Sequence, residues 1–376
     1  MQKIFITGLY RSGTTLLEKV LNLHPSLHLF SQPFPNLYLE TKKKFYIHKG
    51  LNKIRLLDHL FLEQDYSRDD FCGVLDSCVF STQDVDRLFD AMATYSGQQT
   101  PELLPLRLQI RPGSFFQLYE QLFSSLAENL AKNQVGFLGA KEIICEEFIP
   151  FLLSKGEYAI VIIRDPRDVV TSLNFGQGSS YMGKIRPILY TLRQWRKSVS
   201  FCLEYQDRPN FAYLRYEDLV KDPGSILNWL TQFLRLIPYP RDIFADGIVD
   251  QAGQRWQGNS SFGNYSFISR DSVANFTNKL PEDCVRYIEN VCNPELRYLN
   301  YEFIYHESGP DFDEIRSFKE SFKVDHNDFE AHYTHQPRRI ENEIKRLRYL
   351  NSQLSEAEQK LWFIFPRAYQ DLRAII

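Results

Sequence analysis

Ten residues near the start of the chain combine glycine, arginine and hydroxyl side chains in a spacing suited to binding a phosphate. They read GLYRSGTTLL, from Gly8 to Leu17, and directly follow the apolar run Ile4 to Thr7. Glycine permits positive φ, so successive backbone N–H groups can converge on one anion, and a helix beginning near Thr14 directs its positive end at the same point. We therefore expect a strand, a phosphate-binding loop and a helix.

One position of this loop departs from the phosphate loop GxxxxGK[ST] of ATP and GTP enzymes. Thr14 stands where that motif has lysine, while Arg11 supplies a cation from inside the loop. In those enzymes the lysine reaches the β- and γ-phosphates and the following hydroxyl holds magnesium. The substitution favours a less charged, metal-free group over a nucleoside triphosphate. The alternative is that the glycines only turn the chain.

A second charged segment, RDPRDVVTSL, begins at Arg164 directly after an apolar run. Ser172 lies eight residues later, which is about two helical turns. The segment alone is equally compatible with an anion site and with a helix start in which Asp165 and Asp168 pair with Arg164 and Arg167.

A third segment, RWQGNSSFG from Arg255 to Gly263, is rich in glycine and hydroxyl side chains. Its backbone N–H groups and the side chains of Asn259, Ser260 and Ser261 are suited to binding phosphate or adenine. An ordinary turn is the alternative.

Four short apolar runs alternate with helical patterns and therefore predict strands at 4–7, 136–140, 158–163 and 211–215. Such alternation implies a parallel sheet with ligands at the carboxyl ends of its strands. Gly8, Lys141 and Arg164 all follow strand ends, so we expect three distant segments to converge on one crevice.

Two further stretches read as mostly helical. Residues 34–135 hold many aromatic side chains, which we expect to form the core of a helical layer, and this insertion is also a place for an acceptor pocket. From 308 the chain becomes a charged tail whose alternating charges predict a solvated helix face. Ser355 and Glu358 form a predicted capping box, and Pro366 should kink or end the last helix.

The predicted fold is therefore an α/β, P-loop-like domain of three layers with a central parallel sheet. The predicted division is a domain at 1–307, including the helical insertion 34–135, and a helical C-terminal extension at 308–376.

Composition limits the function further. The chain has 376 residues, 43% hydrophobic, and a net charge of −3, so a protein that coats nucleic acid is not expected. The six cysteines form no CxxC pair, so neither a zinc site nor a disulfide framework is indicated. No apolar run approaches the length that spans a bilayer, about 20 residues. The first strand begins within three residues of Met1, which predicts a cytoplasmic location.

The loop and the RDPRDVVTSL segment together resemble the superfamily of sulfotransferases that use 3′-phosphoadenosine 5′-phosphosulfate (PAPS), in the style of the carbohydrate and tyrosylprotein enzymes with an RSGTT loop. The resemblance covers roughly residues 3–300. It implies PAPS as donor, 3′-phosphoadenosine 5′-phosphate (PAP) as product, and no metal. It also implies donor contacts from Arg11, Ser12, Gly13, Thr14 and Thr15 to the 5′-phosphosulfate, from Arg164 and Ser172 to the 3′-phosphate, and from the late loop at Gly258, Asn259 and Ser260.

The resemblance also bears on catalysis. Lys141 resembles the lysine that related enzymes place at this strand end, so Lys141 and Arg11 are the expected catalytic cations. In the similar enzymes a glutamate follows the helix-ending His-Pro within about ten residues, whereas this chain has Gln32 there. A neutral amide is no general base. The proton acceptor is therefore unassigned, with candidates His28, Glu40, Asp76 and Glu142.

The leading hypothesis is a metal-independent sulfotransferase that acts on a hydroxyl or amine of a small-molecule, glycan or lipid acceptor. One alternative is an ATP-dependent phosphotransferase of the P-loop type, against which the missing lysine argues. The other is an adenine nucleotide-binding protein without catalysis, for which Gln32 argues.

Overall fold

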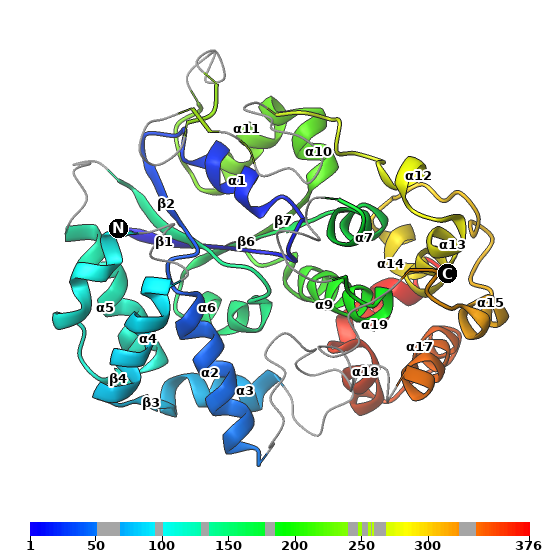
Figure 1. The fold of residues 1–376 in the computed structure, drawn as a ribbon, viewed down its shortest axis with the longest axis horizontal. Helices are drawn as coiled ribbons and strands as arrows, with labels where there is room; N and C mark the ends of the chain where they lie inside the picture. Colours follow the sequence, from blue (N-terminus) through cyan, green and yellow to red (C-terminus); the bar gives the residue numbers. More distant parts are fainter. Residues whose placement is uncertain are drawn as a thin grey trace.

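A parallel sheet of five strands forms the centre of the molecule (Figure 1). The computed structural model describes residues 1–50, 68–94, 101–128, 135–176, 185–239, 247–249, 255, 256, 258, 268–322 and 336–376. The strand order is β2-β5-β1-β6-β7. The strands are β1 (Gln2–Thr7), β2 (Leu27–Ser31), β5 (Phe137–Lys141), β6 (Tyr158–Ile163) and β7 (Phe211–Arg215). The predicted α/β class and central parallel sheet are confirmed.

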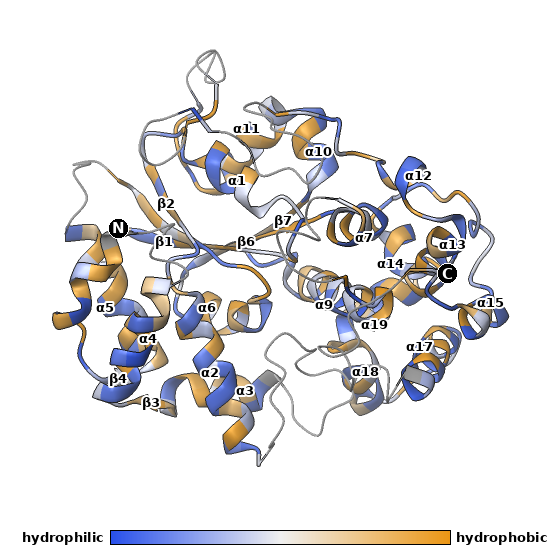
Figure 2. Ribbon diagram, viewed as in Figure 1, coloured by the Kyte–Doolittle hydropathy of each residue, from blue (hydrophilic) through white to orange (hydrophobic). Residues whose placement is uncertain are grey.

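Alternation along the strands explains why the sheet has a core on each face. In β1, Phe5 belongs to one buried cluster, while Ile4 and Ile6 belong to the other. In β6, Val161 and Ile162 divide in the same way. Because successive side chains of a strand point to opposite faces, a fully apolar run such as β6 needs cover on both sides. Figure 2 shows β6 as mainly hydrophobic, whereas the surrounding helices carry both hydrophobic and hydrophilic sides.

Helices supply this cover, which makes the three predicted layers (Figure 1). Leu residues of α1 (Thr14–Leu21), α10 (Tyr216–Lys221) and α11 (Pro223–Phe233) pack in the cluster of Ile4. Residues of α6 (Ile149–Ser154), α7 (Pro166–Asn174) and α9 (Ile188–Tyr205) pack in the cluster of Phe5.

Strand β2 was not among the predicted strands. It pairs in parallel with β5, with Leu27 opposite Phe137. The strand has only five residues and closely follows the end of α1 at Leu21, so its local pattern is short. Its pairing with a strand more than 100 residues away defines it.

Between β2 and β5 the chain is mostly helical. The elements are α2 (Pro35–His48), α3 (Arg68–Ser77), α4 (Thr82–Thr94), the 3-10 helix η2 (Pro101–Leu108) and α5 (Phe115–Glu128), with a small antiparallel pair of β3 (Val79–Phe80) and β4 (Gly113–Ser114). Aromatic rings fill the space between them. Phe34 and Phe123 lie 5.0 Å apart, and Tyr38 and Phe148 lie 4.6 Å apart. The prediction that these aromatic side chains form a core is confirmed.

The C-terminal part is also helical. It contains α12 (Phe276–Lys279), α13 (Glu282–Val291), α14 (Asn293–Tyr298), α15 (Phe312–Ser317), α17 (Gln336–Tyr349), α18 (Glu356–Phe363) and α19 (Pro366–Arg373). Ser355 and Glu358 form the predicted capping box at α18. Pro366 occupies the first turn of a new helix, so α18 ends before it as predicted. In the predicted helical tail, the first helix after 308 ends at Ser317, and 323–335 lie outside the described residues.

The prediction of a solvated helix face in the tail holds for one side of α17, where Glu341, Lys345 and Arg348 are exposed, but not for the other. Glu343 and Arg346 of α17 are 3% and 4% exposed, so this side of the helix is buried rather than solvated. The Arg346 guanidinium lies 2.8 Å from the Glu295 carboxylate of α14. Ile344 and Leu347 belong to the same buried cluster as Phe5 of β1. The boundary at 307/308 stays a prediction. In the described residues, no helix is both long and apolar enough to cross a membrane.

Candidate functional site

The site residues predicted from the sequence lie along the carboxyl edge of the sheet. Gly8, Gln32 and Arg164 follow the ends of β1, β2 and β6, and Lys141 is the last residue of β5. Since these four strands are neighbours in the order β2-β5-β1-β6, their ends meet at one edge. The expected convergence of three distant segments is therefore present in the fold.

The loop after β1 has the backbone conformation expected of an anion-binding turn. Gly13 has φ 96°, and Arg11, a non-glycine residue, has φ 66°. A Cβ at Gly13 would lie 2.5 Å from the Tyr216 ring, so only glycine fits this close approach. The hydroxyl of Ser12 is buried and has no hydrogen-bond partner. A buried, unsatisfied hydroxyl is costly, and a bound oxyanion would satisfy it.

The helix that follows completes this loop. Gly13 is the N-cap of α1, and Thr14 and Thr15 are its first two residues. Thr14 is buried, whereas Thr15 is partly exposed. The first N–H groups of a helix have no partner within it, so the start of α1 is suited to an anion.

Arg164 and Ser172 both contact this loop. The Arg11 Nε donates a hydrogen bond to the Ser172 Oγ over 3.0 Å, and the Arg164 Nη1 donates to the Arg11 carbonyl over 3.1 Å. Arg164 also donates to the Ser272 carbonyl, and its guanidinium lies over the Tyr216 ring, 4.7 Å from the centroid. Its Nε is buried without a partner.

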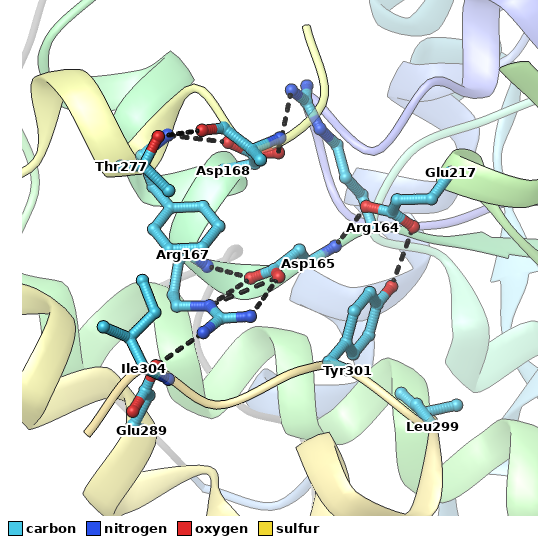
Figure 3. Close-up of polar contacts among 12 residues, drawn as sticks. Arg164, Asp165, Arg167, Asp168, Glu217, Thr277, Glu289, Leu299, Tyr301 and Ile304 are labelled. Carbon is cyan, nitrogen blue, oxygen red and sulfur yellow. Dashed lines mark hydrogen bonds and ion pairs between the residues drawn. The ribbon is translucent and has the colours of Figure 1, made fainter. Parts of the chain in front are cut away.

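The ion pairs proposed as the alternative for this segment are present as well (Figure 3). Arg167 pairs with Asp165 at 2.6 Å and with Glu289 of α13 at 2.5 Å, so its charge is fully compensated. Arg164 lies 3.8 Å from Asp168, a looser contact. Burial raises the pKa of Asp168 to about 6. The two arginines therefore differ in their contacts. Arg167 forms buried ion pairs that stabilise the fold, whereas Arg164 contacts the loop after β1.

Backbone anchors hold this segment in place. Asp168 accepts hydrogen bonds from the backbone N–H groups of Ala274 and Phe276, over 2.8 and 3.0 Å. The Asp165 N–H donates to Glu217, which also accepts from the Tyr301 hydroxyl (Figure 3). Burial raises the pKa of Glu217 to about 7.

Lys141 meets Gln32 at the other end of the edge. The Lys141 Nζ donates to the Gln32 Oε1 over 3.3 Å, and the Gln32 N–H donates to the Lys141 carbonyl over 2.7 Å. Gln32 has φ 48°, a left-handed backbone that is uncommon for a non-glycine residue. Burial lowers the pKa of Lys141, and the carboxylate of Glu18 opposes this shift. Lys141 has no ion pair within the described residues.

The four candidates for a proton acceptor differ in their surroundings. Glu40 and Asp76 form surface ion pairs with Lys43 and Lys155, and these pairs explain them without a catalytic role. His28 lies in β2, where its ring packs edge-on against Phe30. Glu142 is buried next to Lys141, accepts a hydrogen bond from the Phe34 N–H over 2.7 Å, and has its pKa raised by burial to about 8.

The late loop is described only in part. Gly258 has φ 78°, whereas Asn259, Ser260 and Ser261 lie outside the described residues. Two contacts of Arg164 were not predicted. Tyr216 directly follows β7 and could have been found by its place at a strand end, but Ser272 carries no local signal.

The residues at this edge fit an anionic ligand with two charged ends. The Ser12 hydroxyl and the Arg164 Nε are both buried without partners. Lys141 is a buried cation without a carboxylate at ion-pair distance among the described residues. Because buried polar and charged groups are costly unless paired, these three groups are suited to partners that a phosphate or sulfate would supply.

Comparison with known proteins agrees with the resemblance stated from the two motifs. A family model described as "Sulfotransferase family" matches residues 3–102, and one described as "Sulfotransferase domain" matches residues 152–300. A 3-beta-hydroxysteroid sulfotransferase of Cavia porcellus is 30% identical over 135 residues, which are 32% of this chain and 45% of that protein. The chain therefore matches less than half the length of this curated relative.

Two solved structures are similar at low identity. A sulfotransferase domain from the curacin biosynthetic pathway is 20% identical, covering 81% of this chain and 99% of that one, with a TM-score of 0.43. A mouse sulfotransferase complexed with PAP is 14% identical, covering 79% and 85%, with a TM-score of 0.42. The two family matches include the loop at Gly8 to Leu17 and the segment from Arg164 to Ser172. The chain belongs to the sulfotransferase superfamily.

Proposed function

We propose that this protein is a sulfotransferase that moves the sulfuryl group of PAPS to a hydroxyl or amine of an acceptor. The observation that carries the proposal is the contact of Arg164 and Ser172 with the Arg11 loop, at 3.1 and 3.0 Å. A donor with a phosphate at each end of its ribose needs two cationic points at a fixed separation. The loop and the start of α7 supply them from separate strands.

The donor contacts follow from the position of each group. Arg11 and the N–H groups and hydroxyls of Ser12, Gly13, Thr14 and Thr15 would hold the 5′-phosphosulfate. Arg164 and Ser172 would hold the 3′-phosphate, with Gly258, Asn259 and Ser260 over the nucleotide. The unsatisfied Ser12 hydroxyl and Arg164 Nε support this assignment, since each has a hydrogen bond to give.

Lys141 would act on the transferring group. PAPS supplies a good leaving group, the 5′-phosphate, on which negative charge grows during transfer. A cation fixed beside that charge lowers the barrier, and fixed electrostatic contacts are among the largest contributions in enzymes. Gln32 would orient the Lys141 ammonium through the contact of 3.3 Å without neutralising it.

The proton of the acceptor needs another group, because an amide cannot accept it. Glu142 fits this role better than the other three candidates. It lies next to Lys141, and burial raises its pKa to about 8, so its ionised fraction, which grows as the pH approaches 8, is a stronger base than an exposed glutamate.

We further propose a small-molecule, glycan or lipid acceptor and a cytoplasmic location. The curated relative is named for a 3-beta-hydroxysteroid, which supports a small alcohol acceptor. All six cysteines are free thiols, in keeping with a reducing compartment.

A thermal shift measurement tests the proposal against its alternatives. PAP without magnesium should raise the melting temperature, because a ligand at 100 times its dissociation constant adds about 2.7 kcal/mol of stability, a shift of a few degrees. ATP with magnesium should not. A preference for ATP and magnesium would contradict the proposal in favour of phosphoryl transfer. PAP binding without turnover of labelled PAPS on any of a panel of alcohols, phenols and amines would favour a nucleotide-binding protein without catalysis.

A further inference from the structure

Arg186 is a buried cation near the donor loop that the proposed mechanism does not use. It is 5% exposed and precedes α9. The side chain of Asn174, at the end of α7, holds its backbone at both polar groups: the Arg186 N–H donates over 3.0 Å and its carbonyl accepts over 2.9 Å. Asn174 lies two residues after Ser172 on the same helix. Arg186 is therefore fixed relative to the proposed donor site.

The guanidinium of Arg186 lacks the partners that a buried cation needs. Its Nε and Nη1 are sealed from solvent and have no hydrogen-bond partner. Among the described residues, no carboxylate lies within ion-pair distance of it. Among the described residues it contacts Tyr10, whose ring lies 4.5 Å from the guanidinium carbon. A cation–π contact offsets only part of the cost of burying a charge, so the guanidinium is suited to an anion that the described residues do not supply.

The position of Arg186 separates it from the nucleotide contacts. Tyr10 directly precedes Arg11, and its hydroxyl donates to Gln194 of α9 over 2.6 Å. Tyr10 belongs to the large core cluster that contains Phe34 and Tyr38 of the helical stretch between β2 and β5 and also Leu173 of α7. Arg164 instead lies over Tyr216, which belongs to the cluster on the other face of the sheet. Arg186 thus lies beside Tyr10 and α9, on the opposite face of the sheet from Tyr216.

A second group on this side is also unsatisfied. The Thr191 hydroxyl, in the first turn of α9, is buried without a hydrogen-bond partner. Burial raises the pKa of the Tyr10 hydroxyl, whereas the side chains of Arg186 and Thr191 lower it. The three side chains therefore share one environment. A cation and a hydroxyl without partners in one place are suited to an oxyanion.

We infer that the acceptor of this enzyme is itself anionic, and that Arg186 binds its carboxylate or other oxyanion beside Tyr10. This inference rests on the proposed function. A neutral acceptor would leave the Arg186 charge buried and unpaired, whereas an acidic one pairs with it and thereby fixes its reacting oxygen relative to the Arg11 loop.

Benzoate and benzamide are a matched pair of probes for this site, since they share shape and differ in charge. Their binding to the PAP-saturated protein is measured by thermal shift, in wild type, Arg186→Gln and Arg186→Lys. Arg208→Gln, at an exposed turn after α9, is the control. We expect benzoate, but not benzamide, to stabilise wild type and Arg208→Gln. The dissociation constant for benzoate should rise about tenfold or more in Arg186→Gln, with partial recovery in Arg186→Lys.

Three results would overturn the inference: no response of wild type to benzoate, an equal response in Arg186→Gln, or weaker PAP binding in Arg186→Gln, which would assign the residue to the donor. If Arg186→Gln fails to fold, the inference is tested by the benzoate response of Arg186→Lys and by the difference between benzoate and benzamide in wild type. Failure of the proposed function is a separate result, because it appears as no stabilisation by PAP, and the benzoate series repeated without PAP still tests Arg186.

Discussion

Two regions of the molecule bury arginine and lysine in opposite ways. Where α17 packs on α9 and α14, the Arg196 guanidinium lies 2.6 Å from Glu343, and Arg346 lies 2.8 Å from Glu295. At the carboxyl edge of the sheet, Lys141 and Arg186 are as deeply buried, yet neither has an ion pair within the described residues. In the first region each buried arginine, Arg193 included, has a carboxylate partner. In the second, carboxylates such as Glu18 act on Lys141 without an ion pair among the described residues.

The buried glutamates of the two regions show the same contrast. Burial raises the pKa of Glu142, beside Lys141, to about 8. Burial also acts to raise the pKa of Glu343, but Arg196 and Arg346 outweigh it and hold the pKa below its ordinary value. Glu343 is thus a structural anion with its cations built in. The comparison teaches that burial alone does not mark a functional charge, whereas burial without a counter-charge does.

The largest expected effect is a loss of stability at the contact of α17 with α9 and α14, which we call the paired interface. Glu343→Gln leaves Arg193 and Arg196 buried without the Glu343 carboxylate, while Arg346 keeps Glu295, and breaking a buried pair in this way costs about 3–5 kcal/mol. Urea unfolding should show this loss. PAP affinity should change little in the folded variant, because Glu343 lies in the C-terminal helices and contacts no proposed donor residue.

Glu341→Gln on the same helix is the matched control. Glu341 pairs with Arg316 at 2.8 Å, but both side chains are largely exposed, so little stability should be lost. Equal losses in the two variants would contradict the distinction between a buried structural pair and a surface pair.

The next largest expected effect is a loss of turnover, and it concerns Lys141 at the carboxyl edge of the sheet. Lys141→Ala removes the cation proposed to act on the transferring group, and loss of one such contact lowers kcat about 100- to 1,000-fold. PAP affinity and the urea midpoint should stay close to wild type, since Lys141 forms no ion pair within the described residues. Steady-state kinetics with labelled PAPS and PAP titration separate the two quantities.

Lys155→Ala is the control for this variant, because Lys155 forms a surface pair with Asp76 at 3.4 Å. It should keep full activity. A fully active Lys141→Ala would show that the assigned role of Lys141 is wrong.

The edge was largely predictable from the sequence, and physical reasons explain why. Gly8, Lys141 and Arg164 each follow an apolar run that reads as a strand, and parallel strands bring their carboxyl ends together. The RSGTT loop needs only local chemistry to be recognised. The structure adds the contacts among these residues, while their roles in transfer stay predictions.

The paired interface was not predictable in the same way. In the sequence, Glu343 and Arg346 are ordinary members of a charged helix, and the charges alternate as on a solvated face. Their burial depends on Arg196, which lies about 150 residues earlier, and no local pattern reports such a partner. Ser272 and strand β2 were missed for the same reason: each is defined by a contact with a distant part of the chain.

The smallest expected effect is a pH dependence of opposite sign in the two regions. The folded-state pKa of Glu142 is about 8, against an ordinary value of 4.5, so the folded protein keeps a proton that the unfolded chain releases. Stability from this group therefore falls as the pH rises from about 4.5 to 8. Glu142→Gln keeps the shape and the acceptor for Phe34 but does not titrate, so it should become more stable relative to wild type over this range.

Glu343 should behave in reverse. Its folded-state pKa is lowered, so its contribution is present above the ordinary value of 4.5 and is lost as the pH falls through the folded value. The melting temperature of each variant minus that of wild type, measured from pH 4 to 9, should rise with pH for Glu142→Gln. For Glu343→Gln it should fall as the pH rises from the acidic end and then level off. Parallel curves would remove the contrast between the two regions, because they would mean that Lys141 compensates Glu142 as fully as Arg196 compensates Glu343.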